Sequence, residues 1–336
     1  MANIISGPIT MQGKLEAIQK EIKQNYESYF QKAALHRMWF PDHLEQRNQM
    51  AKMGHMISKN TKEILLGFLG VESVVDDYVF EGIKGAGDSV ATRELYMQWG
   101  FEERRHGQTF RHSLIDSGLY TQEFVDKYLT EVSQHHWTFQ EQTGYEGNVL
   151  LASAYAIFQE RHTRWNYTNI RRILWEEYGS PRDKEGRRVD PAVAGAIRYP
   201  ETDEGAHEAN FTNIVSIYMK YLPDLAIEAL SKVSKHYTMP VVQLPNGDEF
   251  LKAILASGLG RAKDVISEIM TPSIERFGLE SRQALKKATR NIMGLPEGAI
   301  VKIHDKDLEN IEITAESQIF EMQSTGDFIL LKKEDS

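Results

Sequence analysis

Four glutamates and two histidines lie among the apolar residues of helical segments, and this pattern limits the possible folds more than any other feature. Between residues 95 and 114, selected side chains recur every three or four residues, which places them on one helix face. They are Leu95, Trp99, Glu103, His106, Phe110 and Leu114. The Glu103-x-x-His106 pair is therefore expected on the apolar stripe and not on the solvated face.

Three further helical segments carry a stripe of the same kind with a polar centre. Their members are Leu65, Phe68, Glu72, Val75 and Val79; Val149, Ser153, Ala156, Glu160, Thr163, Tyr167 and Ile170; and Glu204, His207, Phe211, Ile214 and Tyr218. The order along the chain is thus Glu, Glu-x-x-His, Glu and Glu-x-x-His. The spacing of three places each glutamate and its histidine about one turn apart on the same face.

Four buried carboxylates would repel one another and would be costly without compensating charge. Two divalent cations carry a formal charge that balances four glutamates, and oxygen ligands with two imidazoles suit iron or manganese. A Glu from each of two helices and Glu-x-x-His from each of two others form the di-metal site of certain four-helix bundles. The pattern predicts such a site.

Each part of the pattern also has an ordinary interpretation when it is taken alone. Glu103 and His106 fit a solvated ion-pair cluster with the neighbouring arginines, and Glu72 fits the boundary of an amphipathic helix. Glu160 can pair with a nearby arginine, and His207 can be a core histidine. The adjacent histidines 135 and 136 point apart on a helix, so we expect them at the surface or its boundary.

The amino-acid composition excludes several kinds of metal ligand, catalysis and binding partner. The 336-residue chain has no cysteine, which excludes thiolate ligands, iron–sulfur clusters and cysteine catalysis. Its formal charge of −9 argues against broad nucleic-acid binding. No apolar run is long enough for a membrane span, and the amino-terminal residues lack the features of a secretory signal. We therefore expect a cytoplasmic protein.

The chain reads as long helices up to about residue 235. Breaks are expected at 84–89, 141–148, 178–191 and 238–250, where glycine, proline and charged residues gather. Residues 295–336 are the most strand-like part. We therefore predict a helical di-metal domain at 1–294 and a tail or small appended segment at 295–336.

Several motifs resemble those of the soluble, plant-type acyl-carrier-protein desaturases, members of the ferritin-like di-iron superfamily. They are "LLGFLGVE" (65–72), "EERRHG" (102–107), "FQER" (158–161) and "DEGAHE" (203–208), with weaker matches at "MWFPD" (38–42) and "YTMPVVQLPNGD" (237–248). The resemblance spans roughly residues 30–250. It implies an all-α, ferritin-like four-helix bundle core with additional helices.

The resemblance also implies roles for individual residues. The iron ligands would be Glu72, Glu103, His106, Glu160, Glu204 and His207, with Glu103 and Glu204 bridging the two irons. Asp203 would accept a hydrogen bond from the far nitrogen of His106. Thr163 matches a family threonine near the oxygen-binding side, and Trp39 matches a tryptophan beside the ligands.

The activity implied by the resemblance is dioxygen-dependent desaturation of a fatty acyl group on acyl carrier protein. Two electrons would come from a ferredoxin-like donor, and a homodimer is expected. An acidic carrier should meet a basic patch. Candidates are Arg171, Arg172, Arg182, Lys184, Arg187 and Arg188, although the last four also fit a solvated charged loop.

This sequence differs from the family pattern in regions that would affect which substrate is bound, and not at the predicted metal ligands. The 178–191 connection is long, Pro200 either begins or kinks the last ligand-bearing helix, and the carboxy-terminal region has little match. Two alternatives therefore stay open. One is a di-iron oxygenase that hydroxylates, oxidises an amine or cleaves a carbon–carbon bond in a specialised pathway. The other is a ferritin-like iron-binding protein without organic substrate.

The remaining charged residues of the "EERRHG" motif are not predicted to be ligands. Glu102 is expected to be a neighbour on another helix face, and Arg104 and Arg105 are expected to face solvent or a partner.

Overall fold

The computed structural model describes residues 10–140, 147–237, 239, 244–259 and 261–278, together with four strands between 300 and 331. The long helices are α1 (Met11–His36), α3 (Lys59–Glu72), α4 (Val75–Ala86), α5 (Val90–Asp116), α6 (Gln122–Val132), α8 (Val149–Glu177), α9 (Ala192–Tyr221), α10 (Pro223–His236) and α11 (Gly247–Ala256). The short ones are η1 (Pro41–His43), α2 (Arg47–Met53), η2 (Gly54–Met56), α12 (Ala262–Asp264), η3 (Val265–Met270) and α13 (Thr271–Glu275).

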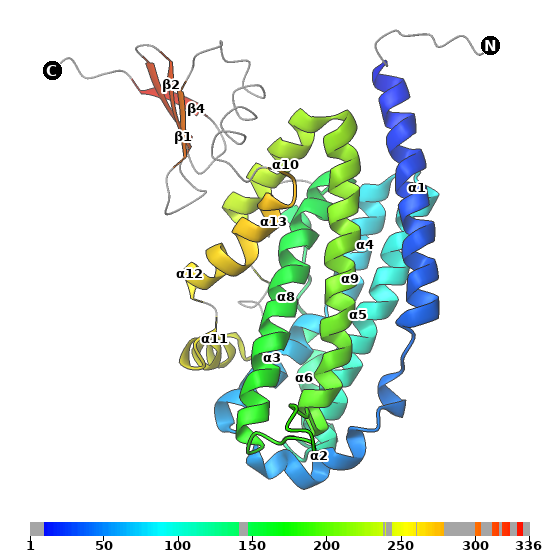
Figure 1. Ribbon diagram of the computed structural model, residues 1–336, viewed down its shortest axis with the longest axis vertical. Helices are drawn as coiled ribbons and strands as arrows, with labels where there is room; N and C mark the ends of the chain where they lie inside the picture. The colour runs from blue at the N-terminus through cyan, green and yellow to red at the C-terminus, as the bar shows by residue number, and fades with distance from the viewer. Residues whose placement is uncertain are drawn as a thin grey trace, which may run out of the picture.

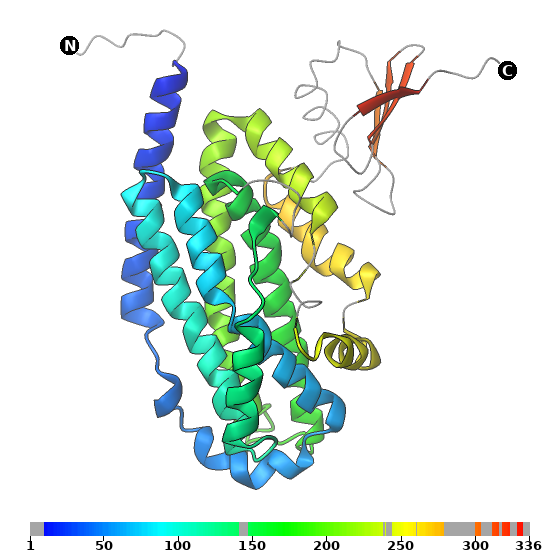
Figure 2. The same cartoon turned by 180° about the vertical axis from the view of Figure 1, so that it is seen from behind.

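The long helices form a bundle (Figure 1). Helices α8 and α9 pack side by side, α5 packs against α3, α4 and α9, and α1 lies along α5 and α9. Figure 2 shows α4 and α5 from the other side. Helices α10 and α13 cover α8, and α11 covers α3. This arrangement surrounds the polar stripes of four helices with apolar packing.

Polar caps start several of these helices. The side chains of Thr10, Ser58, Thr121 and Asn148 accept hydrogen bonds from backbone N–H groups in the first turns of α1, α3, α6 and α8. Such caps satisfy N–H groups that have no partner inside the helix. The sequence therefore fixes where the ligand-bearing helices α3 and α8 begin.

Small residues set the close approach of α4 and α5. A Cβ atom on Gly100 would lie 2.2 Å from Val79 Cγ2, and one on Gly82 would lie 2.3 Å from Tyr96 Cδ1. Any larger residue at either position would push the two helices apart. The glycines thus hold α5, which carries the first Glu-x-x-His motif, against its neighbour.

The structure interrupts the stripe predicted over residues 65–79. Helix α3 ends at Glu72 and α4 begins at Val75, so the five residues do not lie on one continuous helix. Ser73 donates a side-chain hydrogen bond to the Leu69 carbonyl, and such a bond competes with the helical pattern. Glu72 consequently stands at a helix end.

The expected breaks are otherwise close to the observed ones. The first is shorter than predicted, because α4 continues to Ala86 and α5 begins at Val90. Residues 141–146 lie outside the described residues, and α11 already begins at Gly247. The 178–191 connection separates α8 from α9. Pro200 lies inside α9, so it does not begin that helix.

The strand-like segment contains β1 (Ile300–Ile303), β2 (Ile311–Ala315), β3 (Gln318–Met322) and β4 (Phe328–Leu331). They form an antiparallel sheet in the order β1-β2-β3-β4. Its register pairs Ile300 with Thr314 and Ile319 with Leu331. Residue 294 lies outside the described residues, so the predicted domain boundary stays a prediction.

The described residues contain no helix that is both long and apolar enough to cross a membrane.

From the packing of Phe110 beside the polar cluster, we predict that its removal lowers the stability of the protein. Phe110 is fully buried and its ring lies 5.4 Å from that of Phe68 and 5.3 Å from that of Tyr167. Phe110→Ala should lower the free energy of unfolding by about 3–5 kcal/mol. Phe80, which is 68% exposed, is the control, and Phe80→Ala should cost less than about 0.5 kcal/mol. Urea titrations of both variants would measure this, and equal costs would contradict the packing.

Candidate metal centre

The six predicted ligands converge from four helices. Glu72 ends α3, Glu103 and His106 lie on α5, Glu160 lies on α8, and Glu204 and His207 lie on α9. All six are buried. They form two groups in which the donor atoms lie within 4.8 Å of one another: Glu72, Glu103, His106 and Glu204; and Glu103, Glu160, Glu204 and His207. Two glutamates, one from each Glu-x-x-His motif, belong to both groups.

Both imidazoles turn the same nitrogen toward the glutamates. His106 Nδ1 lies 3.0 Å from Glu103 Oε2 and 3.2 Å from Glu204 Oε1. His207 Nδ1 lies 2.8 Å from Glu103 Oε1 and 3.2 Å from Glu160 Oε2. The ring centroids are 5.7 Å apart. The two Nδ1 atoms and the four carboxylates therefore face one shared space.

The opposite nitrogens face two outer acids. His207 Nε2 lies 2.8 Å from Glu102 Oε2, and His106 Nε2 lies 3.5 Å from Asp203 Oδ2. An outer acid that accepts from Nε2–H leaves Nδ1 free as a donor to a metal. Each acid directly precedes the glutamate of one motif and contacts the histidine of the other. The two helices thus orient each other's imidazoles.

One expectation for the "EERRHG" motif was wrong, and another was incomplete. Glu102, expected only as a neighbour of the ligand on another helix face, is 1% exposed and contacts His207. Arg105 does not face solvent, since it is 3% exposed and donates to Asp203 and to the Trp39 carbonyl. Arg104 is exposed as expected. The signal for Glu102 was present, because Glu102 precedes Glu103 just as Asp203 precedes Glu204.

Basic residues neutralise the outer acids. One guanidinium nitrogen of Arg37 lies 2.9 Å from Glu102 Oε2 and 3.3 Å from Asp203 Oδ1. Arg105 lies 2.9 Å from Asp203 Oδ2. The indole of Trp39 also donates to Asp203, at 2.9 Å, and stacks on His106. Two carboxylates with two guanidinium groups make this outer layer electrically neutral.

Within the described part of the chain, no arginine or lysine forms an ion pair with the four inner glutamates, whose ion-pair partners are the two histidines. Burial and the charge of Glu103 raise the pKa of Glu72, Glu160 and Glu204. Burial opposes the charged form of both histidines, but Glu103 and the other acids raise the pKa of His106 and His207 above its ordinary value. These shifts favour the protonated forms of the five groups when no cation is present.

The residues fit a pair of divalent cations. Glu103 Oε1, His106 Nδ1, Glu160 Oε1 and Glu204 Oε1 are buried and lack a partner with hydrogen-bond geometry. Such unpaired polar atoms are costly in a protein interior. Two divalent cations among four carboxylates would satisfy these atoms and bring the net charge of the layer to zero. Oxygen and imidazole donors suit iron or manganese.

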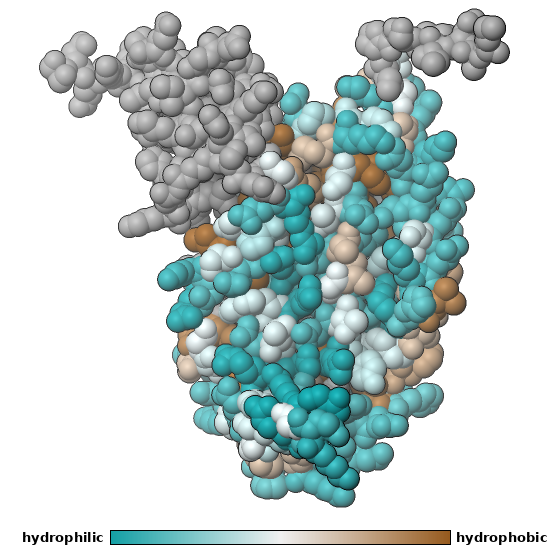
Figure 3. All heavy atoms as spheres, in the orientation of Figure 1, coloured by the Kyte–Doolittle hydropathy of each residue, from teal (hydrophilic) through white to brown (hydrophobic). Residues whose placement is uncertain are grey.

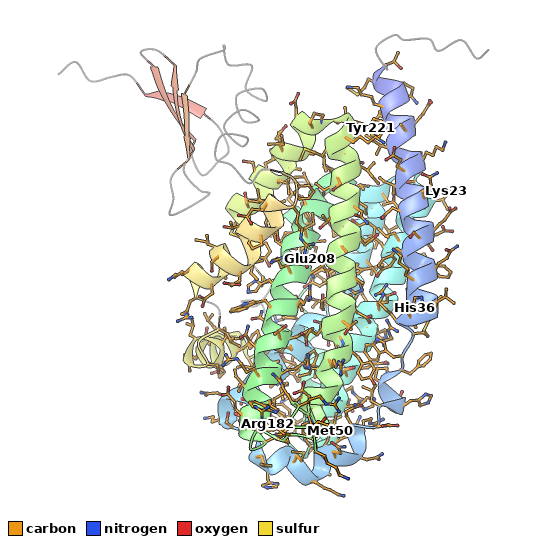
Figure 4. All side chains as sticks on the ribbon, viewed as in Figure 1. Lys23, His36, Met50, Arg182, Glu208 and Tyr221 are labelled. Atoms are coloured by element: carbon orange, nitrogen blue, oxygen red, sulfur yellow. The ribbon has the colours of Figure 1, made fainter. Side chains whose placement is uncertain are left out.

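Other contacts hold the cluster in place. The Tyr167 hydroxyl donates to Glu72 Oε1, and Tyr167 is fully buried. Glu208, labelled in Figure 4, lies on α9 and is fully buried. It accepts from Arg161 at 2.9 Å and lies 3.1 Å from Arg276. Arg161 and Glu208 each follow a predicted ligand in sequence, so their ion pair ties α8 to α9 at the level of the cluster.

Cavities reach Glu72 from two sides. An apolar pocket of about 440 Å³ lies between α3, α8 and α11, and Glu72 and Thr163 line it. A polar cavity of about 540 Å³ lies on the side of α5 and α6, and Glu72, Arg104 and Arg111 line it. The predicted residue Thr163 therefore lies in the apolar pocket beside the cluster.

Most of the arginines proposed for partner binding are already paired. Arg171 contacts Asp190 and Glu201, Arg187 contacts Asp183 and Glu185, and Arg188 contacts Asp190. Hydrophilic side chains cover this end of the bundle, where Figure 4 labels Arg182 (Figure 3). The adjacent histidines 135 and 136 are exposed, as predicted.

Comparison with known proteins agrees with this geometry. The fatty acid desaturase family model matches residues 79–322, which is most of the chain and includes every candidate ligand except Glu72. The chain belongs to the fatty acid desaturase family.

Relatives of this family member include a chloroplastic stearoyl-acyl-carrier-protein 9-desaturase 6 of Arabidopsis thaliana, 26% identical over 253 residues. That match covers 70% of this chain and 60% of the plant protein. DesA1 of Mycobacterium tuberculosis, named as a candidate acyl-carrier-protein desaturase, is 20% identical over 292 residues, covering 81% of this chain and 82% of DesA1.

A solved structure shows the same fold. The X-ray structure of DesA2 from Mycobacterium tuberculosis H37Rv, titled as a candidate acyl-ACP desaturase, superposes with a TM-score of 0.52 at 15% identity. The match covers 81% of this chain and 99% of DesA2. The predicted ferritin-like helical bundle is confirmed.

The outer acids generate the first prediction for this site. Glu102→Gln should weaken iron binding about 10- to 100-fold, because His207 loses a charged acceptor. Glu176→Gln is the matched control, since Glu176 lies on the exposed side of α8 beside Arg172. Competition with a coloured chelator under anaerobic conditions would measure both affinities. Equal affinities for the wild type and Glu102→Gln would contradict the role of Glu102.

The raised pKa values generate a second prediction. A metal competes with protons for Glu72, Glu160, Glu204 and both histidines, whose pKa values are raised, so apparent metal affinity should fall as pH falls. Calorimetric titrations in buffers with different ionisation enthalpies should show net proton release on metal binding. Proton-neutral binding with the same affinity in mildly acidic and neutral buffer would contradict this electrostatic description.

Proposed function

We propose that this chain is a di-iron, dioxygen-dependent oxidoreductase that desaturates an acyl group carried by acyl carrier protein. The observation that carries the proposal is the apolar pocket that ends at Glu72, one of the predicted ligands. Iron storage has no use for an apolar cavity at the metals, whereas an enzyme acting on a hydrocarbon chain needs one. Family membership and the acyl-carrier-protein relatives support the same substrate class.

The proposed reaction removes two hydrogens from neighbouring carbons of the chain. One dioxygen, two external electrons and two protons are consumed, and an alkene and two waters are formed. The irons would be held by Glu72, Glu103, His106, Glu160, Glu204 and His207, and when bound they would supply the oxidising power that an unactivated C–H bond requires. A ferredoxin-like protein is the proposed electron donor.

The protein side of this reaction is positioning and exclusion of water. The pocket wall formed by α3 and α11 would hold the chain through apolar contacts with residues such as Phe68, Phe250 and Ile254. Such contacts fix one pair of carbons beside the metals. Tyr167 would hold Glu72 in place, while Glu102 and Asp203 would keep the two imidazoles turned inward. The polar cavity on the opposite side of Glu72 would give protons a route to the cluster.

Product analysis tests this function most directly. The iron-loaded protein would be reduced, exposed to dioxygen and supplied with a series of saturated acyl carrier proteins. Desaturation lowers the product mass by two units, and hydroxylation raises it by sixteen. A product sixteen units heavier would favour the oxygenase alternative. Iron oxidation with no product from any acyl carrier would contradict the enzyme and favour an iron-binding protein.

The pocket itself predicts a mutational effect. Ile254 lines the pocket from α11 and contributes no ligand to the cluster. Ile254→Trp should reduce turnover of long acyl chains at least tenfold, because the larger side chain fills the space for the chain, and it should leave the iron content unchanged. Leu225→Trp, at an exposed position on α10, is the control. Unchanged turnover of every chain length by Ile254→Trp would place the substrate elsewhere.

A further inference from the structure

The pocket beside Glu72 has two chemically different walls. One wall, from α3, α11 and η3, is mostly apolar and includes Phe68, Val71, Phe250, Leu251, Ile254 and Val265. Asp248, in the first turn of α11, is the charged residue on this side. The other wall comes from α8, where His162, Thr163 and Asn166 are within two turns of each other and line the same pocket. An unsubstituted alkyl chain would match the first wall and not the second.

Two residues of the polar wall lack hydrogen-bond partners among the described residues. Asn166 is 7% exposed, and its amide oxygen is buried without a hydrogen-bond partner among the described residues. Thr163 is also buried, and no described residue makes a hydrogen bond with its hydroxyl group. A buried amide oxygen without a partner is destabilising. Asn166 lines the pocket, and rotation of its side-chain amide would bring this oxygen to a bound molecule that donates a hydrogen bond.

His162 is already oriented by its neighbours. Its Nδ1 lies 3.1 Å from the Tyr237 hydroxyl, and that hydroxyl lies 3.2 Å from the Phe158 carbonyl. The same hydroxyl also lies 3.1 Å from the Met239 sulfur, so its one proton has three neighbouring acceptors and the Nε2 atom of His162 can donate or accept. The α8 wall thus combines an imidazole, a hydroxyl group and an amide.

We infer that the substrate of this pocket is an acyl chain with a neutral hydrogen-bonding substituent, a hydroxyl or an amide, at the level of Asn166. The inference rests on the proposed function for the identity of the cluster and specifies the substrate class further. Asn166 follows Glu160 by six residues on α8, and Glu72 lines the same pocket. The substituent would therefore lie a few carbons from the position that is oxidised.

Binding of matched probes tests this inference without turnover. N-acetylcysteamine thioesters of decanoate and of hydroxydecanoates, with the hydroxyl group moved along the chain one carbon at a time, would be titrated into iron-loaded protein kept free of dioxygen. At least one hydroxylated isomer should bind about 5- to 100-fold more tightly than decanoyl thioester, as one satisfied buried polar group predicts. Tightest binding by the unsubstituted chain, or no binding by any probe, would overturn the inference.

A variant pair separates recognition from general damage. Asn166→Leu should abolish the preference for the hydroxylated isomer, strengthen binding of the decanoyl thioester, and raise the midpoint of thermal unfolding because an unpaired amide is removed. Asn169→Leu, on the same helix but outside the pocket, should keep the preference. An unchanged preference in Asn166→Leu would also overturn the inference.

These experiments distinguish a failure of the substituted-chain inference from a failure of the proposed function. If the protein binds two irons and desaturates plain acyl chains with no preference for substituted ones, the proposed function stands and the inference fails. If the protein binds no iron, the proposed function fails, and the thioester titrations on the metal-free chain still show whether the pocket prefers a hydroxylated chain.

Discussion

The electrostatic repulsion among four buried glutamates is the constraint on which the rest of this structure depends. Glu72, Glu103, Glu160 and Glu204 share one space with two imidazoles, and no arginine or lysine of the described residues pairs with them. Cations or protons must neutralise them. The surrounding layer is neutral by itself, because Arg37 and Arg105 balance Glu102 and Asp203. The inner layer is therefore left to be balanced by metal charge.

This separation of charge explains how the helices are arranged. Each Glu-x-x-His helix provides an outer acid for the histidine of the other, so α5 and α9 must face each other in one register. The Arg161–Glu208 ion pair holds α8 against α9 at the same level. Interactions that look like ordinary ion pairs thus determine the positions of the inner donor atoms.

The sequence predicted the cluster because its ligands follow the helical period. Two Glu-x-x-His motifs and two stripe glutamates lie at intervals that a helix brings to one face, and apolar neighbours place that face inside. The caps and the 178–191 connection follow from residue types with known local preferences. The pattern thus predicted a helical di-metal bundle, and the resemblance to the acyl-carrier-protein desaturases implied that this bundle is ferritin-like.

Other features depend on contacts that no local pattern encodes. Arg105 is buried because Asp203, 98 residues away, accepts from it, and Glu102 is central because His207 on another helix contacts it. The pocket needs α11 to close over α3 and α8. The end of α3 at Glu72 is equally unpredictable from periodicity, since Val75 and Val79 continue the same spacing into the next helix.

The location of bound iron is the decisive measurement for this charge balance. Crystals of the iron-loaded protein, measured at the iron absorption edge, would give an anomalous difference map. Two iron peaks per chain are expected, both within the cluster, with Glu103 and Glu204 contacting each of them. A single iron peak, or iron bound only outside these six residues, would contradict this charge balance.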